Sequence, residues 1–534
     1  MAMSGPEKNE ECQVIAPLGT PPGLLEAFWR YDTALLANDR DTLDELFMPG
    51  PHTLRGDGQA LLVGHEAIAG FRSARARIPT RRVAQLHVQV VADDAVLLMA
   101  RTRDGEATGL QTQLWHLTED RWTVAAAHVS LPMAPKPAGP AAPFDTTVWR
   151  AIGDPLVAAD VQGPLDGVGV AVKDLFAVAG QPIGAGVPAW LAEQRPEVQS
   201  APAVSALLAA GAHVVGIART DEFAYSLAGT NAHYGTPPNP AAPGCVSGGS
   251  SSGPASAVAL GQATVGLGTD TAGSIRVPAS YQGLIGLRTT HGAISTAGVL
   301  PLARSFDTVG WLTRDVRTSA AVARALLPAD SHGAVPVGRT VRLPEVEALA
   351  RADVRDAFTT AVEELTRAGQ LPPAETVDLP HDVLERWFTA FRTVQAWEAW
   401  RAHGEWITAH PGALGTDVAT RFAQASAISD EQAAAARELT AAAREQLGEW
   451  LAGGVLVIPS ASGPAPARSA SGEQIEAERA ATLRMTCLAG LAGAPALSLP
   501  LLRADGRPAG LCLLGAPGTD HGLLALATAL ETPV

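Results

Sequence analysis

Residues 244–280 read GCVSGGSSSGPASAVALGQATVGLGTDTAGSIRVPAS, and this stretch decides the fold. It belongs to a longer segment, residues 223–269, that carries no formal charge. On composition alone a Gly/Ser-rich run is typical of a flexible linker. Its neighbours favour order instead, because an apolar AVAL segment follows it and GLGTD and TAGSIR have the pattern of fixed turns. We therefore expect small residues that let backbone amides approach a ligand closely.

Known short motifs do not account for this stretch. Residues 249–253, GSSSG, match the G-x-S-x-G nucleophile elbow, which needs a strand directly before it, but the preceding NPAAPGCV is broken by prolines. The chain has no S-x-x-K and no G-x-x-x-x-G-K phosphate loop. Cys245 has no basic neighbour in sequence to activate its thiol, so we interpret it as a packed residue.

The histidines give no sign of a metal site. His65-Glu66 lacks the second histidine of H-E-x-x-H, and the 13 histidines show no ligand spacing. We expect neither a metal nor a cofactor.

One lysine stands out by its isolation. Of the 39 basic residues only three are lysines, namely Lys8 in a polar tail, Lys136 among prolines, and Lys173. A nucleotide composition that favours arginine codons explains the general scarcity but not the retention of Lys173. Arginine keeps its proton in proteins, whereas a buried lysine can be neutral and act as a base. A hydroxyl nucleophile needs such a base, and this pattern makes Lys173 a candidate.

Composition and charge exclude several classes of protein. The chain has 534 residues, 47% of them hydrophobic and 17% charged, which indicates two domains with large cores. A net charge of −15 gives no general attraction to nucleic acid or to an anionic membrane. Four widely spaced cysteines fit a reducing compartment, and the N-terminal sequence has no signal-peptide pattern. We expect a cytoplasmic protein without a membrane span.

Composition breaks divide the chain into four parts. Residues 1–16 form a polar tail, residues 17–131 a compact unit, residues 132–147 a proline-rich linker, and residues 148–534 a second unit. The first unit begins with helical spacing and continues with alternating segments typical of strands, which predicts an α+β fold. In the second unit, GVGVAVKDLF and AHVVGIA flank a helical PAVSALLAAGA, so βαβ units and a largely parallel sheet are predicted.

A series of motifs in the second unit resembles the amidase signature family. In chain order they are GVAVKDLF, RTDEFAYSLAGTNAHYGTPPNP, GGSSSG, GLGTDTAGSIRVPA and GLRTTHGAIS, followed by VLVIPSASGPAPA, GLAGAPALSLPLL and GLCLLGAPGTDHGLLALA. The resemblance implies an α/β fold with a mixed central sheet flanked by helices. Many members have GLKPT where this chain has Gly-Leu-Arg288-Thr-Thr, so lysine gave way to arginine there but not at position 173.

The resemblance also implies a Ser–cis-Ser–Lys triad. By motif, the base is Lys173, the bridging residue is Ser250 after a cis peptide bond, and the nucleophile is Ser274. The implied oxyanion hole consists of the backbone amides of Thr271, Ala272, Gly273 and Ser274, and the implied supporting residues are Gly248, Gly249, Ser251, Asp270 and Arg276.

The first unit resembles small cone-shaped domains of the nuclear-transport-factor-2-like fold. FWRYDTALLANDRDTLDELF, GHEAIAGFRSARA and WTVAAAHVSL carry this likeness, and the branch includes hydrolases of carboxylated ureas from cyanuric acid breakdown. The resemblance implicates Tyr31 and Arg55, and Arg72 and Arg75 are further candidates to bind a carboxylate. A non-catalytic dimerisation module with Tyr31 in its core is the alternative, so a homo-oligomer, for instance a dimer through this unit, is expected.

Two classes of function therefore stand. The first is a free-standing amidohydrolase that cleaves a small-molecule amide, for example a urea-derived or carboxylated one. The second is an amidotransferase A-type subunit that supplies ammonia in a transamidation complex. The additional cone-shaped domain and the absence of a basic patch for tRNA favour the first.

Overall fold

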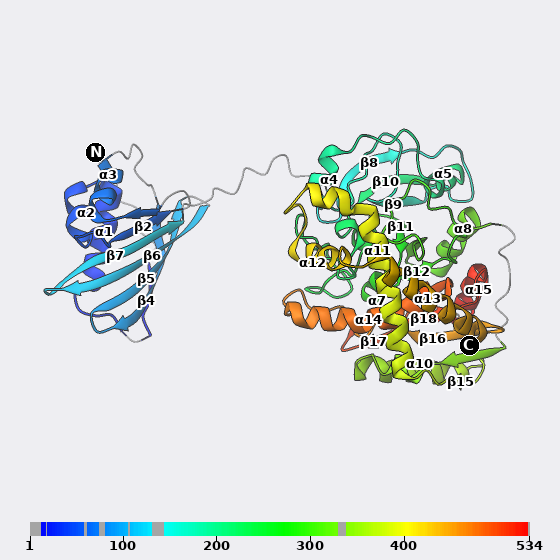
Figure 1. Cartoon of the computed structure of the whole chain (residues 1–534). Helices are drawn as coiled ribbons and strands as arrows, with labels where there is room; N and C mark the ends of the chain where they lie inside the picture. The colour runs from blue at the N-terminus through cyan, green and yellow to red at the C-terminus, as the bar shows by residue number, and fades with distance from the viewer. Residues whose placement is uncertain are drawn as a thin grey trace, which may run out of the picture. The chain divides into compact units, whose positions relative to one another are not determined.

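The computed structural model describes residues 12–17, 19–57, 61–73, 81–104, 107–130, 144–328 and 338–531. The chain divides between Ala142 and Pro143 into two compact units (Figure 1). The buried apolar residues of the two units form separate clusters. The cluster of the first unit contains residues between 24 and 127, and the clusters of the second unit contain residues beyond 147. The linker predicted over residues 132–147 lies outside the described residues, apart from 144–147.

The first unit is a curved seven-stranded sheet covered by three helices. Its elements are β1 (Gln13–Ile15), α1 (Leu24–Ala37), α2 (Arg40–Leu46), β2 (Leu54–Asp57), β3 (Leu61–Val63), α3 (His65–Ser73), β4 (Arg82–Ala92), β5 (Ala95–Asp104), β6 (Ala107–Thr118) and β7 (Arg121–Ser130). Strands β4 to β7 form the predicted meander, since each pairs antiparallel with the next. Strand β1 falls in the segment interpreted as a polar tail and pairs with β4.

The second unit is built on an eleven-stranded sheet in the order β15-β14-β16-β18-β17-β12-β13-β11-β9-β10-β8. Its strands are β8 (Trp149–Val157), β9 (Gly169–Lys173), β10 (His213–Ala218), β11 (Val265–Asp270), β12 (Ile285–Arg288), β13 (Thr308–Thr313), β14 (Arg339–Arg342), β15 (Ala374–Thr376), β16 (Gly454–Pro459), β17 (Ala496–Ala504) and β18 (Arg507–Leu514). Strand β9 lies between β10 and β11 and pairs parallel with both, as the βαβ pattern predicts.

The expectation of a largely parallel sheet is wrong for the rest of this unit, where hairpins and return strands make most pairs antiparallel. The pairs β8–β10, β11–β13, β12–β13, β12–β17, β16–β18 and β17–β18 all run antiparallel. Two residues with positive φ, Asp505 and Gly506, connect β17 to β18. An Asp-Gly pair between apolar runs is a strong hairpin signal. The mixed sheet implied by the family resemblance is confirmed.

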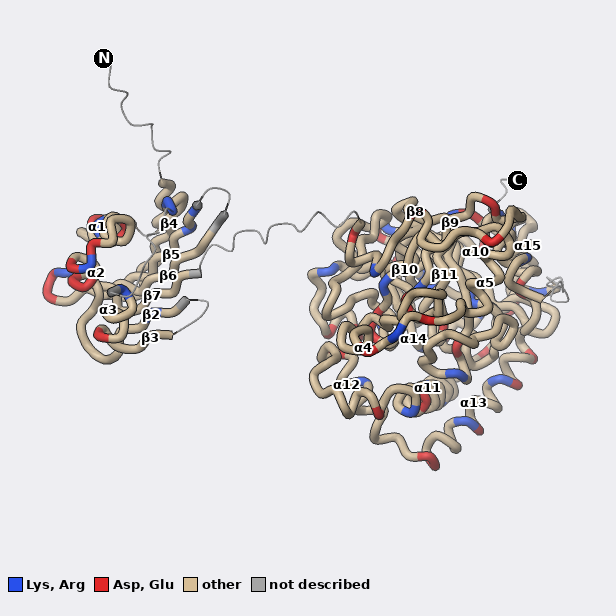
Figure 2. Tube along the Cα trace, turned by 90° about the horizontal axis from the view of Figure 1, so that it is seen from above, with Lys and Arg blue, Asp and Glu red and all other residues tan. Residues whose placement is uncertain are grey.

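Helices cover both faces of this sheet (Figure 1). They are α4 (Pro188–Glu193), α5 (Pro202–Ala209), α6 (Ser252–Ala259), α7 (Arg276–Gln282), α8 (Val316–Leu326), α9 (Pro344–Glu347), α10 (Ala352–Arg367), α11 (His381–Ala409), α12 (Thr416–Ala425), α13 (Asp430–Leu451), α14 (Gly472–Ala492) and α15 (Asp520–Glu531), with a 3₁₀ turn η1 (Glu222–Ala224). Basic and acidic residues recur along the trace of α13 (Figure 2). Within the described ranges, no helix is both long and apolar enough to cross a membrane.

The separate cores lead to a first prediction. A chain that begins at Pro143 retains every core residue of the second unit, so we expect it to fold alone and to keep the amide hydrolysis that the family resemblance implies. Thermal unfolding and ammonia release from simple amides, both compared with the full chain, check this. A fragment that aggregates or is inactive while the full chain is active would show that the second unit depends on the first.

Candidate active site

Lys173 lies at the carboxyl end of β9 and is fully buried. Strand β11 runs parallel to β9, so its own carboxyl end, with Thr269, comes to the same edge of the sheet. The Lys173 Nζ donates hydrogen bonds of 2.9 Å to the Oγ of Ser250 and of 2.9 Å to the Oγ1 of Thr269. The lysine therefore faces hydroxyl groups that come from two separate parts of the chain.

Ser250 links this lysine to a second serine. It precedes α6, the Gly249–Ser250 peptide bond is cis, and its Oγ donates a hydrogen bond of 3.0 Å to the Oγ of Ser274. Its carbonyl oxygen accepts hydrogen bonds from the Thr220 hydroxyl, at 2.9 Å, and the Asp221 amide, at 3.3 Å. A Cβ at Gly249 would lie 2.4 Å from the Asp221 carboxylate, so only glycine fits there. The Ser250 side chain is thereby held between Lys173 and Ser274.

Ser274 lies in the turn between β11 and α7. The Asp270 carboxylate accepts hydrogen bonds from the amides of Gly273, at 2.8 Å, and Ile275, at 3.1 Å, and so fixes the backbone on both sides of the serine. The Gly273 φ of +125° requires glycine at this position. Because its amide is directed to Asp270, the predicted oxyanion hole is left with the amides of Thr271, Ala272 and Ser274.

Two arginines hold the Asp270 carboxylate in place. Arg276 donates to it through Nε, at 3.1 Å, and Nη2, at 2.9 Å, and Arg288 donates through Nη1 at 3.2 Å. All three side chains are fully buried. Burial alone would raise the pKa of Asp270, but the two guanidinium groups hold it well below its ordinary value. Arg288, which replaces a lysine of the family motif, therefore serves as a permanent cation.

Burial lowers the pKa of Lys173, because it disfavours the charged form of the amine. Desolvation lowers the pKa of Lys173 from 10.5 to about 7, and the nearby carboxylates of Asp221, Asp270 and Asp307 offset this effect only in part. Near neutral pH a large share of the lysine is then uncharged and can accept a proton. A neutral amine hydrogen-bonded through Ser250 to Ser274 is the arrangement expected for activating a hydroxyl nucleophile.

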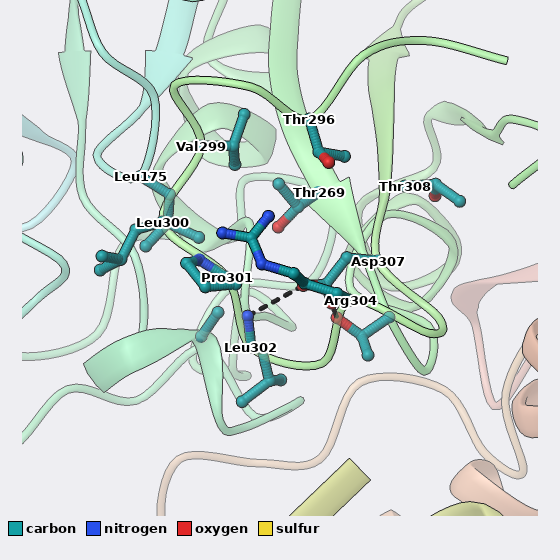
Figure 3. A pocket seen from close by; sticks show the side chains of 12 residues that line it. Leu175, Thr269, Thr296, Val299, Leu300, Pro301, Leu302, Arg304, Asp307 and Thr308 are labelled. Carbon is teal, nitrogen blue, oxygen red and sulfur yellow. Dashed lines mark hydrogen bonds between the residues drawn. The ribbon is translucent and has the colours of Figure 1, made fainter. Parts of the chain in front are cut away.

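A narrow cavity reaches the serine. It is lined by Ser274 and by Ala224, Tyr225, Ser226, Leu227, Thr271, Ala272, Leu302, Gln395, Arg479 and Leu483. A second narrow cavity lies beside Thr269 and Asp307 and has Arg304 at its centre in Figure 3. The two share Ala224, Thr271 and Leu302 in their walls. Ser274 is therefore part of the wall of the first cavity.

The remaining predicted residues around the loop are buried supports. The Ser251 hydroxyl donates to the Thr269 carbonyl oxygen at 3.3 Å, and a Cβ at Gly248 would lie 2.8 Å from the Pro278 Cα. No strand directly precedes Ser251 among the described residues, so the condition for a nucleophile elbow is not met. Cys245 is buried, as expected of a packed residue, but the absence of a basic neighbour holds in sequence only, because Arg507 Nη1 donates to its Sγ at 3.7 Å.

In the first unit the predicted residues lie near one another. Tyr31 is buried on α1, with its ring 6.1 Å from that of Trp115, and Arg72 is buried on α3 with its guanidinium 3.9 Å from the centre of the Phe47 ring. Arg55 on β2 lies over the Phe71 ring at 4.3 Å. Arg75 lies outside the described residues.

Sequence reasoning missed a buried polar cluster in this unit. Arg81 donates hydrogen bonds to Asp32, at 2.9 Å, and to the Oε1 of Gln111, at 2.7 Å, while the Oε1 of Gln113 accepts from Trp115 at 3.2 Å. Because both glutamines accept these hydrogen bonds through Oε1, their Nε2 atoms point away from Arg81 and Trp115. The buried nitrogens left without an acceptor are Arg72 Nη2, Arg81 Nη1, Gln111 Nε2 and Gln113 Nε2. Strand alternation would have placed both glutamines on one face, but not beside Arg81.

Three more residues at the serine site were not singled out. Thr269 lies within the quoted GLGTD motif, and its position one residue before Asp270 was the available signal. Asp221 and Asp307 lie near Lys173 through folding alone. Within the described ranges, no group of three or more His, Cys, Asp or Glu side chains is arranged to hold a metal ion.

Comparison with known proteins agrees with this geometry. Residues 150–524 match the family described as Amidase, and residues 19–135 match the family described as AtzH-like. Amidase 1 of Oryza sativa subsp. japonica is 35% identical over 399 residues, which cover 68% of this chain and 89% of that protein. A crystal structure of an amidase aligns with a TM-score of 0.63 at 33% identity, over 70% of this chain and 85% of that one.

A relative of the amidotransferase class matches less completely. The A-type subunit of the glutamyl-tRNA(Gln) amidotransferase from Geobacter metallireducens is 39% identical over 249 residues, only 43% of this chain and 50% of that protein. The family match spans most of the second unit, and the aligned amidases are covered over most of their length. The chain therefore belongs to the amidase family and carries an AtzH-like domain in its N-terminal part.

Proposed function

We propose that the chain is a free-standing amidohydrolase in which Ser274 is the nucleophile, Ser250 the proton relay and Lys173 the base. Hydrolysis of small-molecule amides is the activity that the family and the aligned amidases support. One observation carries the assignment of residues, namely the unbroken hydrogen-bonded series from Lys173 through Ser250 to Ser274 beside a cavity.

In the proposed reaction the Ser274 Oγ attacks the amide carbonyl carbon. For this step the two hydroxyl hydrogens rotate toward the lysine, so that Ser274 donates to Ser250 and Ser250 donates to the lone pair of neutral Lys173. The Ser274 proton then passes to Ser250 and the Ser250 proton to Lys173, which leaves Ser250 as a hydroxyl and the lysine charged. The amides of the turn stabilise the oxyanion of the tetrahedral intermediate. Collapse breaks the C–N bond as a proton returns to the leaving amine, and water then hydrolyses the acyl-enzyme by the same relay.

The alternative, an ammonia-supplying component of a transamidation complex, is less well supported. The matched amidotransferase protein is covered over only half its length, whereas the amidases are covered over most of theirs. The first unit, which matches the AtzH-like family, is also a separate domain with its own core. Both features favour a hydrolase that acts without a partner protein.

For the first unit we propose a small-carboxylate site around Tyr31. Four buried donors without an acceptor, on Arg72, Arg81, Gln111 and Gln113, favour an anion, because an unpaired buried donor is costly. Two further proposals concern this unit: Tyr31 and Arg55 are site residues for a carboxylated urea, and the protein assembles into a homo-oligomer through this sheet. Exposed apolar side chains on its strands, including Val91, Met99 and Leu110, support the assembly.

Replacement of Ser274 tests the nucleophile. We expect Ser274→Ala to lower turnover at least about a thousandfold, because covalent catalysis is lost while the oxyanion amides remain. Ammonia release from a panel of small amides by the purified protein alone is the measurement, with Ser205→Ala on the exposed face of α5 as the matched control. Near-normal turnover of Ser274→Ala would contradict the triad, and ammonia release only with a partner protein would favour the amidotransferase class.

Replacement of Lys173 tests the base. Lys173→Arg keeps the charge but cannot accept a proton, so we expect it to be nearly as inactive as Lys173→Ala. Since the neutral lysine is the reactive form and its pKa is lowered to about 7, kcat/KM of the unaltered protein should rise with pH through this value and level off above it. An active Lys173→Arg protein, or a rate that falls with pH through this range, would show that the lysine is only a structural cation.

Point variants in the first unit separate a site from a scaffold. We expect Tyr31→Phe and Arg55→Ala in the full chain to abolish activity on carboxylated ureas and to leave the hydrolysis of simple amides intact. Glu66→Gln, at an exposed position of α3, is the control. Size-exclusion measurement of the chain that begins at Pro143 checks the assembly. If the Tyr31 and Arg55 variants change only thermal stability, the first unit is a scaffold.

A further inference from the structure

The cavity that contains Ser274 has a single charged side chain among the described residues of its wall, that of Arg479 on α14. Its other lining residues are half apolar, with Ala224, Leu227, Leu302 and Leu483 among them, and half polar. Arg479 also lines the wide depression that adjoins this cavity through Ser226. The guanidinium group therefore lies where a molecule entering from the depression would meet it on the way to the nucleophile.

The hydrogen bonds of Arg479 are incomplete. Its Nη1 donates to the exposed carboxylate of Glu476 at 2.8 Å, but its Nε is buried and has no acceptor. Burial, together with the charge of Arg421, lowers the pKa of Arg479 to about 10, so the group is still a cation at neutral pH. The Nε atoms of Arg288 and Arg339 are also buried without an acceptor, so Arg479 differs from them by its place in the wall of the Ser274 cavity. Arg479 is thus a charged donor with unused capacity next to the reactive serine.

Two further guanidinium groups surround the same entrance. Arg421 donates through Nη1 to the Tyr225 carbonyl oxygen at 2.9 Å, and the charges of Arg392, Arg421 and Arg479 all act on the Tyr225 side chain. Carboxylates of the depression are in part engaged elsewhere. The Glu222 carboxylate accepts hydrogen bonds from His233 and from the Gly415 amide, both at 2.8 Å. Glu476 forms ion pairs with Arg479 and Arg421. Asp417 also lines the depression.

We propose that the substrate of the Ser274 site is an amide that also carries a carboxylate, and that Arg479 is the residue that selects it. This inference rests on the proposed function and narrows its substrate class. A half-amide of a short dicarboxylic acid matches the chemistry of the cavity wall, because its methylene groups can contact the leucine side chains while its carboxylate accepts from the Arg479 Nε. A charge-assisted hydrogen bond of this kind is among the strong ones in proteins.

Matched pairs of amides test the proposal. Succinamate and glutaramate carry a carboxylate that butanamide lacks, and we expect the unaltered protein to favour them in kcat/KM by at least about tenfold, as one charged hydrogen bond of about 1.5–3 kcal/mol allows. Arg479→Met retains the length and apolar stem of the side chain. It should remove this preference, chiefly by raising KM for the half-amides, so that the ratio of their kcat/KM to that of butanamide falls toward one. Arg367→Met, at an exposed position of α10, is the control.

A binding measurement separates this proposal from the assignment of the nucleophile. In a Ser274→Ala background, calorimetric binding of glutaramate should be detectable and should be lost on adding Arg479→Met. Equal kcat/KM for butanamide and the half-amides, or an unchanged preference in Arg479→Met, would overturn the proposal while leaving the proposed function intact. Arg479-dependent binding of glutaramate without hydrolysis of any amide would support the anion site and overturn the proposed function instead.

Discussion

The geometry of the site depends on one buried carboxylate, that of Asp270. It accepts from two guanidinium groups, Arg276 and Arg288, and from the amides of Gly273 and Ile275. The two amides that donate these hydrogen bonds flank Ser274 in sequence, so the carboxylate that ends β11 also sets the path of the turn that carries Ser274, the proposed nucleophile. Removing one partner of a buried ion pair leaves an uncompensated charge, which typically costs about 3–5 kcal/mol. The position of the serine and the stability of this part of the core are therefore coupled.

The same interaction helps to keep the lysine neutral. The described hydrogen bonds of Lys173 go to hydroxyl groups, those of Ser250 and Thr269, and not to a carboxylate. Nearby acids are engaged elsewhere: Asp270 by two arginines, and Asp221 by the Gly229 amide and the Ser252 hydroxyl. A direct ion pair would hold the lysine in its charged form. Burial without such a pair is the condition under which an amine has a pKa near 7 and can act as a base.

Sequence motifs brought Lys173, Ser250 and Ser274 together as the predicted triad because these residues lie in contiguous segments, GVAVKDLF, GGSSSG and GLGTDTAGSIR, that are visible without a fold, and the structure places the three side chains in hydrogen-bond contact. The parallel arrangement of β9, β10 and β11 followed from the βαβ pattern in the same way. Contacts between distant segments could not be predicted. Arg479 reaches the Ser274 cavity only because α14 packs there, and Arg81 meets Gln111 across the first unit. The antiparallel half of the large sheet was missed because buried strands of either direction have similar apolar runs.

The division of work between arginine and lysine gives these observations a common physical basis. The side chains of the site that must stay positively charged are arginines. Arg276 and Arg288 pair with the buried Asp270 carboxylate, and Arg479 is the proposed partner of the substrate carboxylate. Guanidinium groups remain charged even when buried, which suits a permanent counter-charge or an anion-selecting group. An amine loses its charge readily on burial, and the one lysine beyond residue 136 occupies the position that requires this property. A general preference for arginine codons would act equally at all these positions, so the retention of lysine at 173 favours the proposed role of this residue as a group that exchanges a proton.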